Sequence, residues 1–326
     1  MSLPYGLRLL CLCCASFFMI HLALALAARL SAGTAVRMAE RLKPSSAARL
    51  LFAVRMLPWT LTLFAVLAFC IPSYLWLEPE ATGEKVGFVC FLTALLGAAI
   101  WALAIVRVVS AVRGTARYLH RCERHGEKIT MPGETGPALL LKDRSPVLAV
   151  AGVVHPRLVI SRRVMRGLTT EQIDAALSHE RAHRSSGDNL KRFLMLLAPD
   201  VLPFLRGFVT LERSWAKAIE WAAGDQASAG DPRRALSLAD ALVRVARMGN
   251  KPQLSYLSSA LMADDHDLSD RVDRLLRPQP LPEKPAKELI ALVSGAAGLM
   301  ASALMIVVLW PGTLNMVHQA LEHLVR

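Results

Sequence analysis

Four long apolar runs limit what this chain can fold into more than any other feature of its sequence. The runs are Leu9–Ala28, Met56–Leu77, Val86–Val106 and Leu289–Trp310. Each holds about twenty residues, the length at which an α-helix crosses a hydrocarbon core of roughly 30 Å. The composition agrees, because 54% of the residues are hydrophobic and 20% are charged, which is less charge than an ordinary soluble domain carries. The sequence therefore predicts a mainly α membrane protein with four transmembrane helices.

The charges in the loops between the runs predict how the helices are oriented. The first loop carries five arginines and one lysine against Glu40, whereas the second loop carries three glutamates against Lys85. The long segment Arg107–Glu288 is again rich in arginine. Because basic loops remain in the cytoplasm, we expect the first loop and the long segment inside, and the N-terminus and C-terminal tail outside. The stretch ALALAA resembles a signal-peptide cleavage site, but the loop charges favour a first run that is retained.

The same distribution accounts for the formal net charge of +12. A basic excess can indicate nucleic-acid binding, but a membrane protein with basic loops inside produces it without such a partner. No nucleic-acid partner is therefore expected.

Five of the six cysteines lie within the apolar runs, and no Cys-x-x-Cys pair occurs. The sequence thus indicates neither a disulfide framework nor a zinc site built from thiolates.

The segment between the third and fourth runs has the length of one domain. Three strand-like pieces open it, PALLLKD, PVLAVAG and PRLVISR, separated by proline, glycine and aspartate turn signals. Later helices are expected over Ser214–Gln226, Pro232–Met248 and Leu268–Leu276. Residues 193–211 are apolar but broken by prolines and charges, which favours two short helices over a fifth span. We therefore expect three transmembrane helices in residues 1–113, an α+β domain in 114–288, and the fourth helix with a short external tail in 289–326.

A capped helix is predicted between Thr169 and Gly187. Thr169 followed by Gln172 three residues later is a capping-box pattern, and glycine is common just past the C-terminus of a helix. Apolar residues recur between the two ends at helical spacing, which favours one buried face.

This helix carries His179, Glu180 and His183 in the order His-Glu-x-x-His. Histidines four residues apart project from one face of a helix, one turn apart, so both imidazoles can bind one Zn²⁺ at about 2.0–2.1 Å. Glu180 lies one step round the helix, where it could take a proton from the attacking water and pass it to the leaving amine. The pattern predicts a catalytic zinc site, and the alternative is a surface helix with two solvated histidines.

A catalytic zinc site needs a third protein ligand. The extended motif that would supply another histidine is absent, because Ser186 and Asn189 occupy its positions. A carboxylate on a later helix is therefore expected, and the candidates are Glu212, Glu220 and Asp225. Glu220 is favoured because it lies in the alanine-rich stretch WAKAIEWAAGDQAS, where small side chains allow close helix packing. Asp225 and Asp188 are candidates for carboxylates that orient a histidine ligand, and Asp188 could instead be a polar residue at a helix end.

Residues 145–190 resemble the core of the BlaR/MecR-type membrane zinc metallopeptidases, the antirepressor class. In that family a proline-containing turn and short strands lead into the His-Glu-x-x-His helix, which an aspartate follows shortly, and the arrangement of spans is similar. The resemblance implies a cytoplasmic gluzincin domain between the third and fourth spans. It also implies that His179 and His183 are zinc ligands, that Glu180 is the base and that Glu220 is the third ligand.

Two departures from the family's pattern bear on these expectations. The family usually places an aspartate four residues after the ligand glutamate, whereas this chain has Gly224 there and Asp225 one residue later. Antirepressor sensors also carry an extracellular penicillin-binding domain after the last span, whereas only a short tail follows Trp310. β-Lactam sensing by this chain alone is therefore not expected.

The sequence thus predicts a zinc-dependent endopeptidase of the bacterial cytoplasmic membrane, which uses one catalytic Zn²⁺ to cleave a repressor-like cytosolic protein or another membrane protein. The expected partners are the lipid bilayer and a protein or peptide substrate such as a transcriptional repressor, and a homodimer is left open. A quality-control protease of the HtpX type shares the motif and the membrane setting. A non-proteolytic signalling or scaffold protein with a vestigial metal site is the alternative from another class, although intact His179, Glu180 and His183 argue against decay.

Overall fold

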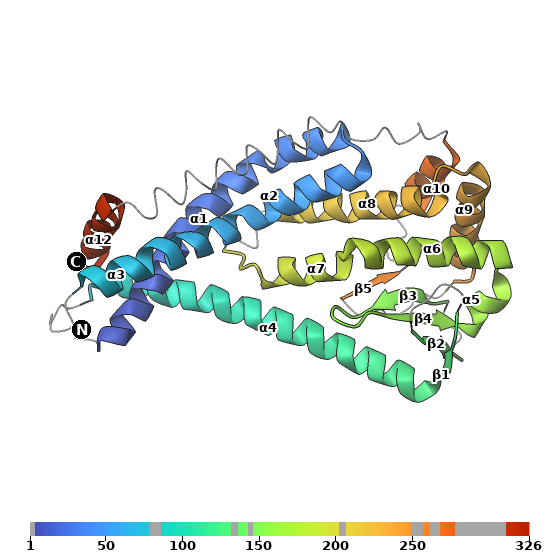
Figure 1. Cartoon of the computed structure of the whole chain (residues 1–326), viewed down its shortest axis with the longest axis horizontal. Helices are drawn as coiled ribbons and strands as arrows, with labels where there is room; N and C mark the ends of the chain where they lie inside the picture. Colours follow the sequence, from blue (N-terminus) through green and yellow to red (C-terminus); the bar gives the residue numbers. More distant parts are fainter. Residues whose placement is uncertain are drawn as a thin grey trace.

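Long helices make up most of the structure, and one small sheet lies at the end far from the two chain termini (Figure 1). The computed structural model describes residues 4–78, 86–131, 136–142, 146–201, 207–249, 257–260, 268–277 and 311–325. The fourth expected span, Leu289–Trp310, and most of the acidic second loop lie outside these described residues.

The described elements fall into two groups along the chain. The first group is α1 (Tyr5–Glu40), α2 (Pro44–Ala65), the π-helical turn η1 (Val66–Cys70), α3 (Ile71–Leu77) and α4 (Phe88–His125). The strands of the second group are β1 (Gly126–Ile129), β2 (Ala138–Leu141), β3 (Leu148–Ala151), β4 (Arg157–Ser161) and β5 (Ser258–Ala260). Its helices are α5 (Arg162–Gly167), α6 (Thr170–Ser186), α7 (Asp188–Leu197), α8 (Gly207–Ser228), α9 (Pro232–Arg247), α10 (Leu268–Leu276) and α12 (Pro311–Val325).

Three helical segments are long and apolar enough to cross a membrane, namely Tyr5–Glu40, Pro44–Leu77 and Phe88–His125. They contain 36, 34 and 38 residues, so each is about 51–57 Å long at 1.5 Å per residue. That length exceeds a hydrocarbon core of roughly 30 Å, and the additional turns come from the basic sequence beside each apolar run. The domain boundary expected after residue 113 therefore falls inside α4, because the helix continues without a break from its apolar part into its polar part.

Helices α1 and α4 cross closely at Gly97. A Cβ atom added to Gly97 would lie 2.3 Å from the carbonyl oxygen of Cys14, a distance that two non-bonded atoms cannot adopt. The lack of a side chain at this position therefore lets the two backbones approach, as small residues do at the interfaces of membrane helices.

The sheet has the strand order β1-β2-β4-β3-β5, in which β2 and β4 are parallel and the other neighbours are antiparallel. The three strand-like pieces expected from the sequence contain β2, β3 and β4. The sequence did not indicate β1, because its residues follow a helical pattern without a break. The structure ends α4 at Gly126, which adopts an extended conformation with φ −100° and ψ 158°. A Cβ atom on Gly126 in this conformation would lie 2.5 Å from the carbonyl oxygen of Cys122. β5 has three residues, too few to give an alternating pattern.

Apolar side chains cover both faces of the central strands. One core joins the sheet to α6 and α9, and its fully buried members include Ile160, Ala176 and Leu242. A smaller core on the other face includes Val159 and Cys122, the latter near the end of α4. The sheet is therefore enclosed between the polar end of α4 and the helices that follow it.

Helix α6 begins and ends as the sequence predicts. The Thr169 side chain accepts a hydrogen bond from the backbone N–H of Gln172, and the Gln172 side chain accepts one from the backbone N–H of Thr169. Gly187 closes the helix with φ 67°, a left-handed conformation that glycine adopts at little cost. The following helix, α7, begins directly after it, and the Asn189 side chain donates hydrogen bonds to the carbonyl oxygens of Val150 and Gly152 at 3.1 and 3.0 Å. The α6–α7 junction is thus fixed to the sheet.

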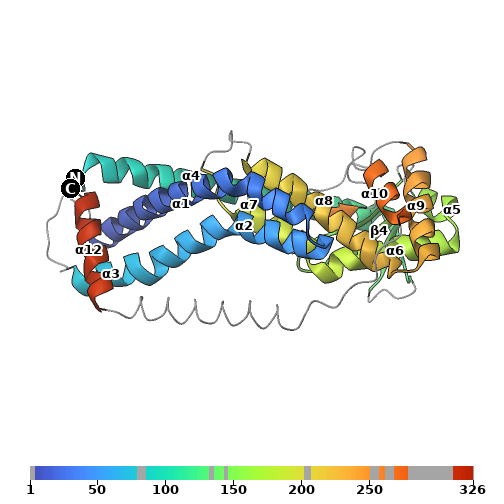
Figure 2. The ribbon, with the colours of Figure 1, turned by 90° about the horizontal axis from the view of Figure 1, so that it is seen from above.

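Helix α8 packs lengthwise against α1 and α2 (Figures 1 and 2). Phe208 of α8 lies between two guanidinium groups, 4.5 Å from that of Arg29 and 4.4 Å from that of Arg55. Arg55 also donates a hydrogen bond of 2.8 Å to Glu212 of α8, and Arg29 pairs with Asp200. Charged contacts therefore attach α8 directly to two of the helices that are apolar enough to span a membrane.

Candidate metal centre

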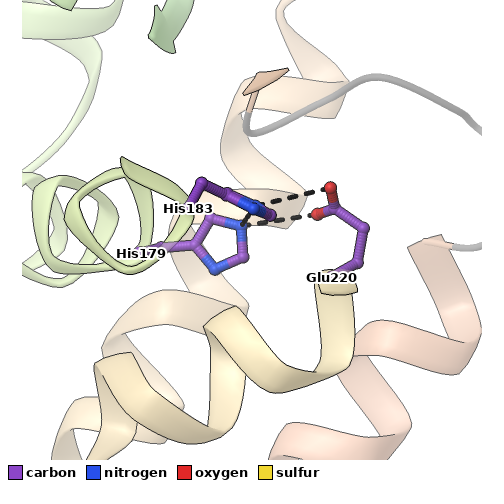
Figure 3. Close-up of side chains that lie close together, drawn as sticks. All are labelled: His179, His183 and Glu220. Carbon is purple, nitrogen blue, oxygen red and sulfur yellow. Dashed lines mark hydrogen bonds and ion pairs between the residues drawn. The ribbon is translucent and has the colours of Figure 1, made fainter. Parts of the chain in front are cut away.

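Helices α6 and α8 bring together three side chains that could hold a metal ion. His179 and His183 project from adjacent turns of α6, and Glu220 reaches towards them from α8 (Figure 3). Both histidines are buried, with 0% and 2% of their surface exposed, and the Glu220 side chain is 13% exposed. The favoured third candidate of the sequence analysis thus lies opposite the two histidines.

The distances between these atoms fit one small ion with tetrahedral coordination. The two Nε2 atoms are 3.2 Å apart, Glu220 Oε2 lies 3.4 Å from His179 Nε2, and Glu220 Oε1 lies 3.4 Å from His183 Nε2. Ligands at 2.0–2.1 Å from a tetrahedral centre are about 3.3–3.4 Å apart. Two imidazole nitrogens and one carboxylate oxygen are also ligands that zinc commonly takes, with a fourth position left for water or substrate. The residues present could therefore hold a metal ion, and their chemistry fits zinc.

The charges around the site perturb all three side chains. Burial lowers the pKa of His179 to about 4. Burial opposes the charge of His183 too, but Glu220 and Asp188 outweigh it and raise the pKa of His183 to about 10. Glu220 is also disfavoured as an anion by burial, yet Arg271 and His183 hold its pKa well below the usual range. Without a metal, His183 and Glu220 therefore form an ion pair, and metal binding must release the proton of His183.

Asp188 lies behind His183 and fixes the orientation of its ring. Asp188 Oδ2 accepts a hydrogen bond of 2.8 Å from His183 Nδ1, and both side chains are at most 3% exposed. With the Nδ1 proton held by Asp188, Nε2 faces His179 and Glu220, and it presents its lone pair there once its own proton is released, as in histidine ligands held by a carboxylate. Lys191 contacts the other oxygen of Asp188 at 3.1 Å. Asp188 owes this position to α7, which begins immediately after the left-handed Gly187.

Glu180 is 1% exposed on the same helix. Its charge is the smallest of the causes that raise the pKa of His183, and Glu180 directly follows His179 in the chain. A proton acceptor for an attacking water would be needed beside the metal ligands, and Glu180 is a buried carboxylate in that position.

The other two acidic candidates have different partners. Glu212 is held by Arg55 of α2. Asp225 lines the same narrow cavity as Glu220, but its Oδ2 atom accepts a hydrogen bond of 2.8 Å from Arg274 of α10. Five residues along a helix correspond to a rotation of about 140° beyond one full turn, so Asp225 faces α10 when Glu220 faces α6. The structure therefore gives Asp225 a contact with α10 in place of the contact with a histidine that the sequence suggested.

Arg271 is part of the site and was missed by reasoning from sequence. Its Nη2 atom lies 3.1 Å from Glu220 Oε2 and 3.3 Å from His179 Nε2, and the residue is 6% exposed. The segment LSDRVDRLL of α10 alternates apolar and charged residues at helical spacing, which predicts an amphipathic helix but not which acidic partner its arginines would meet.

Comparison with known proteins adds no further information, because no model of a known family and no curated protein matches this chain. The resemblance to BlaR/MecR-type metallopeptidases stays a prediction from the sequence, and the functional assignment depends on the geometry of the His179, His183 and Glu220 cluster.

Proposed function

We propose that this chain is a membrane-embedded, zinc-dependent endopeptidase. One observation carries the proposal: the two histidines of a His-Glu-x-x-His helix and a glutamate from a second helix converge in a buried site at the separations of tetrahedral ligands. A solvated surface helix would not hold two histidines at 0% and 2% exposure, nor supply a carboxylate between them. Asp188 behind His183 adds the supporting hydrogen bond that histidine ligands of metals usually have.

His179, His183 and Glu220 would hold the ion in this proposal. A bound Zn²⁺ would supply Lewis-acid chemistry, which polarises a peptide carbonyl and lowers the pKa of a water molecule. Glu180 would take the proton from the attacking water and deliver it to the departing amine nitrogen. The hydrogen bond from His183 to Asp188 would keep the ring oriented throughout. The buried position of Glu180 and the histidines would exclude bulk water from the proton transfer.

The proposed setting is a bacterial cytoplasmic membrane with the peptidase domain on the cytoplasmic side. The basic first loop and the basic segment after the third span support this orientation. Helix α12 lies beside α3 at the end of the molecule where the chain begins, opposite the sheet (Figure 1). This position is consistent with a fourth span over residues 289–310 that returns the chain to the outer side. The proposed substrate is a cytosolic repressor-like protein or another membrane protein, cleaved within an extended segment.

Replacement of Glu180 by glutamine tests the mechanism. E180Q keeps the size of the side chain and removes the proton acceptor, so it should bind zinc like the wild type and lose cleavage by about 10²- to 10⁴-fold. Glu171 lies on the same helix and is exposed, which makes E171Q the matched control with unchanged cleavage. Purified protein in detergent, incubated with an unfolded casein, provides the assay together with zinc analysis. Cleavage by E180Q at the wild-type rate would sink the mechanism.

The range of substrates separates a regulatory peptidase from a quality-control peptidase. Membrane and soluble proteomes should be compared between cells that produce the wild type and cells that produce E180Q. If the peptidase is regulatory, the abundance of one or a few proteins should differ between the two kinds of cell. If it is a quality-control peptidase of the HtpX type, many membrane proteins should accumulate in the cells that produce E180Q. A wild-type protein that folds but binds no zinc would favour the non-proteolytic alternative.

A further inference from the structure

Helix α10 places a cation against the proposed metal ligands. Arg271 Nη2 lies 3.1 Å from Glu220 Oε2 and 3.3 Å from His179 Nε2. An arginine has only donors, so it must donate to the lone pair of His179 Nε2. That lone pair is the one a metal ion would use. Arg271 therefore engages ligand atoms from two of the three side chains that form the proposed metal centre.

Arg271 disfavours metal binding not only because it contacts the ligand atoms but also because it carries a positive charge. A guanidinium remains protonated at any accessible pH, and it cannot coordinate a cation. Like charges a few ångströms apart repel strongly where side chains are buried, and Arg271 is 6% exposed with His179 at 0%. Binding of a divalent cation to Glu220 and His179 is thus weakened for as long as Arg271 keeps this position.

The position of Arg271 is set by the packing of α10 rather than by the site alone. Arg274 pairs with Asp225 at 2.8 Å, and Asp270 pairs with Lys217 of α8 at 2.5 Å. Three apolar side chains of α10 pack against the core beside the sheet, namely Leu268, Val272 and Leu275. Leu275 also lies beside Gly224 of α8, where a Cβ atom would meet Leu275 Cδ2 at the ordinary contact distance of 3.4 Å.

We propose that α10 is an autoinhibitory latch, in which Arg271 occupies Glu220 and His179 and restrains metal binding until α10 withdraws. The latch rests on the proposed function, because it regulates the same metal centre. Different residues of α10 perform the two tasks of the latch. Arg271 blocks the metal ligands, and Arg274 together with the apolar side chains attaches α10 to α8 and the core. A movement of α8 relative to α10, transmitted from α1 and α2 through their contacts with α8, would release the latch.

Zinc affinity of full-length R271Q, measured in detergent by competition with a chromogenic chelator, tests the blocking role. R271Q should bind zinc about tenfold or more tightly than the wild type, as expected for loss of a buried contact to a charged group. R277Q is the matched control, because Arg277 is exposed directly after the end of α10 and is not one of the residues that attach the helix. The variant removes the same charge, and its zinc affinity should change less than about threefold. R271K keeps a charge with a shorter reach and should lie between the wild type and R271Q.

Equal or weaker zinc binding by R271Q, with an unchanged circular dichroism spectrum, would overturn the latch, as would an equal gain in R277Q. Hydrogen exchange provides the second measurement on the wild type. Backbone amides of Leu268–Leu276 should exchange several-fold faster after zinc is added, and unchanged exchange would overturn withdrawal of the helix. These failures are distinct from failure of the proposed function, which would show as a wild type and an R271Q variant that both bind no zinc, or as an active E180Q.

Discussion

Replacement of Asp188 by asparagine would test how the site controls its histidine ligand. Asp188 Oδ2 accepts the hydrogen bond of His183 Nδ1 at 2.8 Å, and the two side chains are 3% and 1% exposed. Asparagine has the same shape, so it removes the negative charge without opening a cavity. The substitution also takes the charge away from Lys191, which lies 3.1 Å from the other oxygen of Asp188.

Two opposing effects set the size of the change. A hydrogen bond to a charged group contributes about 1.5–3 kcal/mol, and loss of the carboxylate behind a histidine ligand costs about 10- to 100-fold in metal affinity. Burial disfavours the charged form of His183, but Glu220 and Asp188 raise its pKa to about 10, so the proton competes with the metal at neutral pH. D188N lowers that pKa and weakens the competition. We therefore expect roughly a tenfold loss of zinc affinity near pH 7 and a larger loss near pH 9.

The assay is zinc competition with a chelator across this pH range, on protein in detergent. The wild-type affinity should rise by about tenfold per pH unit while His183 loses its proton, and the rise for D188N should stop at a lower pH. Asp174 lies on α6 with 57% of its side chain exposed, so D174N is the control and should follow the wild type. The reasoning is refuted if D188N, with unchanged helicity, has the wild-type affinity at both pH values.

Three further predictions concern the fold and its pH dependence. G97V should lower the melting temperature in detergent and cost about 1–3 kcal/mol, because its side chain would meet the Cys14 carbonyl of α1, and an unchanged melting temperature would contradict this crossing. R55M should destabilise the contact of α2 with α8 by about 1–3 kcal/mol, a reduced value because the Glu212 side chain left without its partner is 39% exposed. A thermal melt of L57A, at a position of α2 that is 51% exposed, gives the comparison. His183 binds its proton more tightly in the folded protein than in the unfolded protein. Its stabilising effect on the metal-free protein is therefore complete below about pH 6.5 and is lost as the pH rises through about 10. Scanning fluorimetry of chelator-treated protein should show a melting temperature that falls over this pH range, and saturation with zinc should suppress the fall.

Strong local signals explain which parts of the fold could be predicted. The apolar runs predicted three helices that the structure contains, because only a helix satisfies its backbone within a bilayer. The capping residues predicted both ends of α6, and short apolar runs between proline, glycine and aspartate turn signals predicted β2, β3 and β4. The full lengths of α1 and α4 could not be predicted, because their polar ends carry no signal that separates a continuing helix from a loop.

The candidate site shows the same division between local and distant information. The His-Glu-x-x-His spacing places His179 and His183 on one face of a helix, so their proximity follows from helical geometry alone. The choice of Glu220 came from an alanine-rich stretch and from a family resemblance, and its location opposite the histidines is a fact of helix packing. Arg271 and the partner of Asp225 lie 92 and 49 residues away from the groups they contact. No sequence spacing predicts such contacts, because they depend on where α10 packs.

Zinc content of the purified full-length protein is the most direct test of the central claim. Mass spectrometric metal analysis should find about one zinc per chain in the wild type and in E180Q. The double variant H179A/H183A, which lacks both nitrogen ligands, should retain essentially none while its helical circular dichroism persists. A folded wild type that binds no zinc even when the metal is supplied, or a double variant that binds as much as the wild type, would contradict a metal centre at His179, His183 and Glu220.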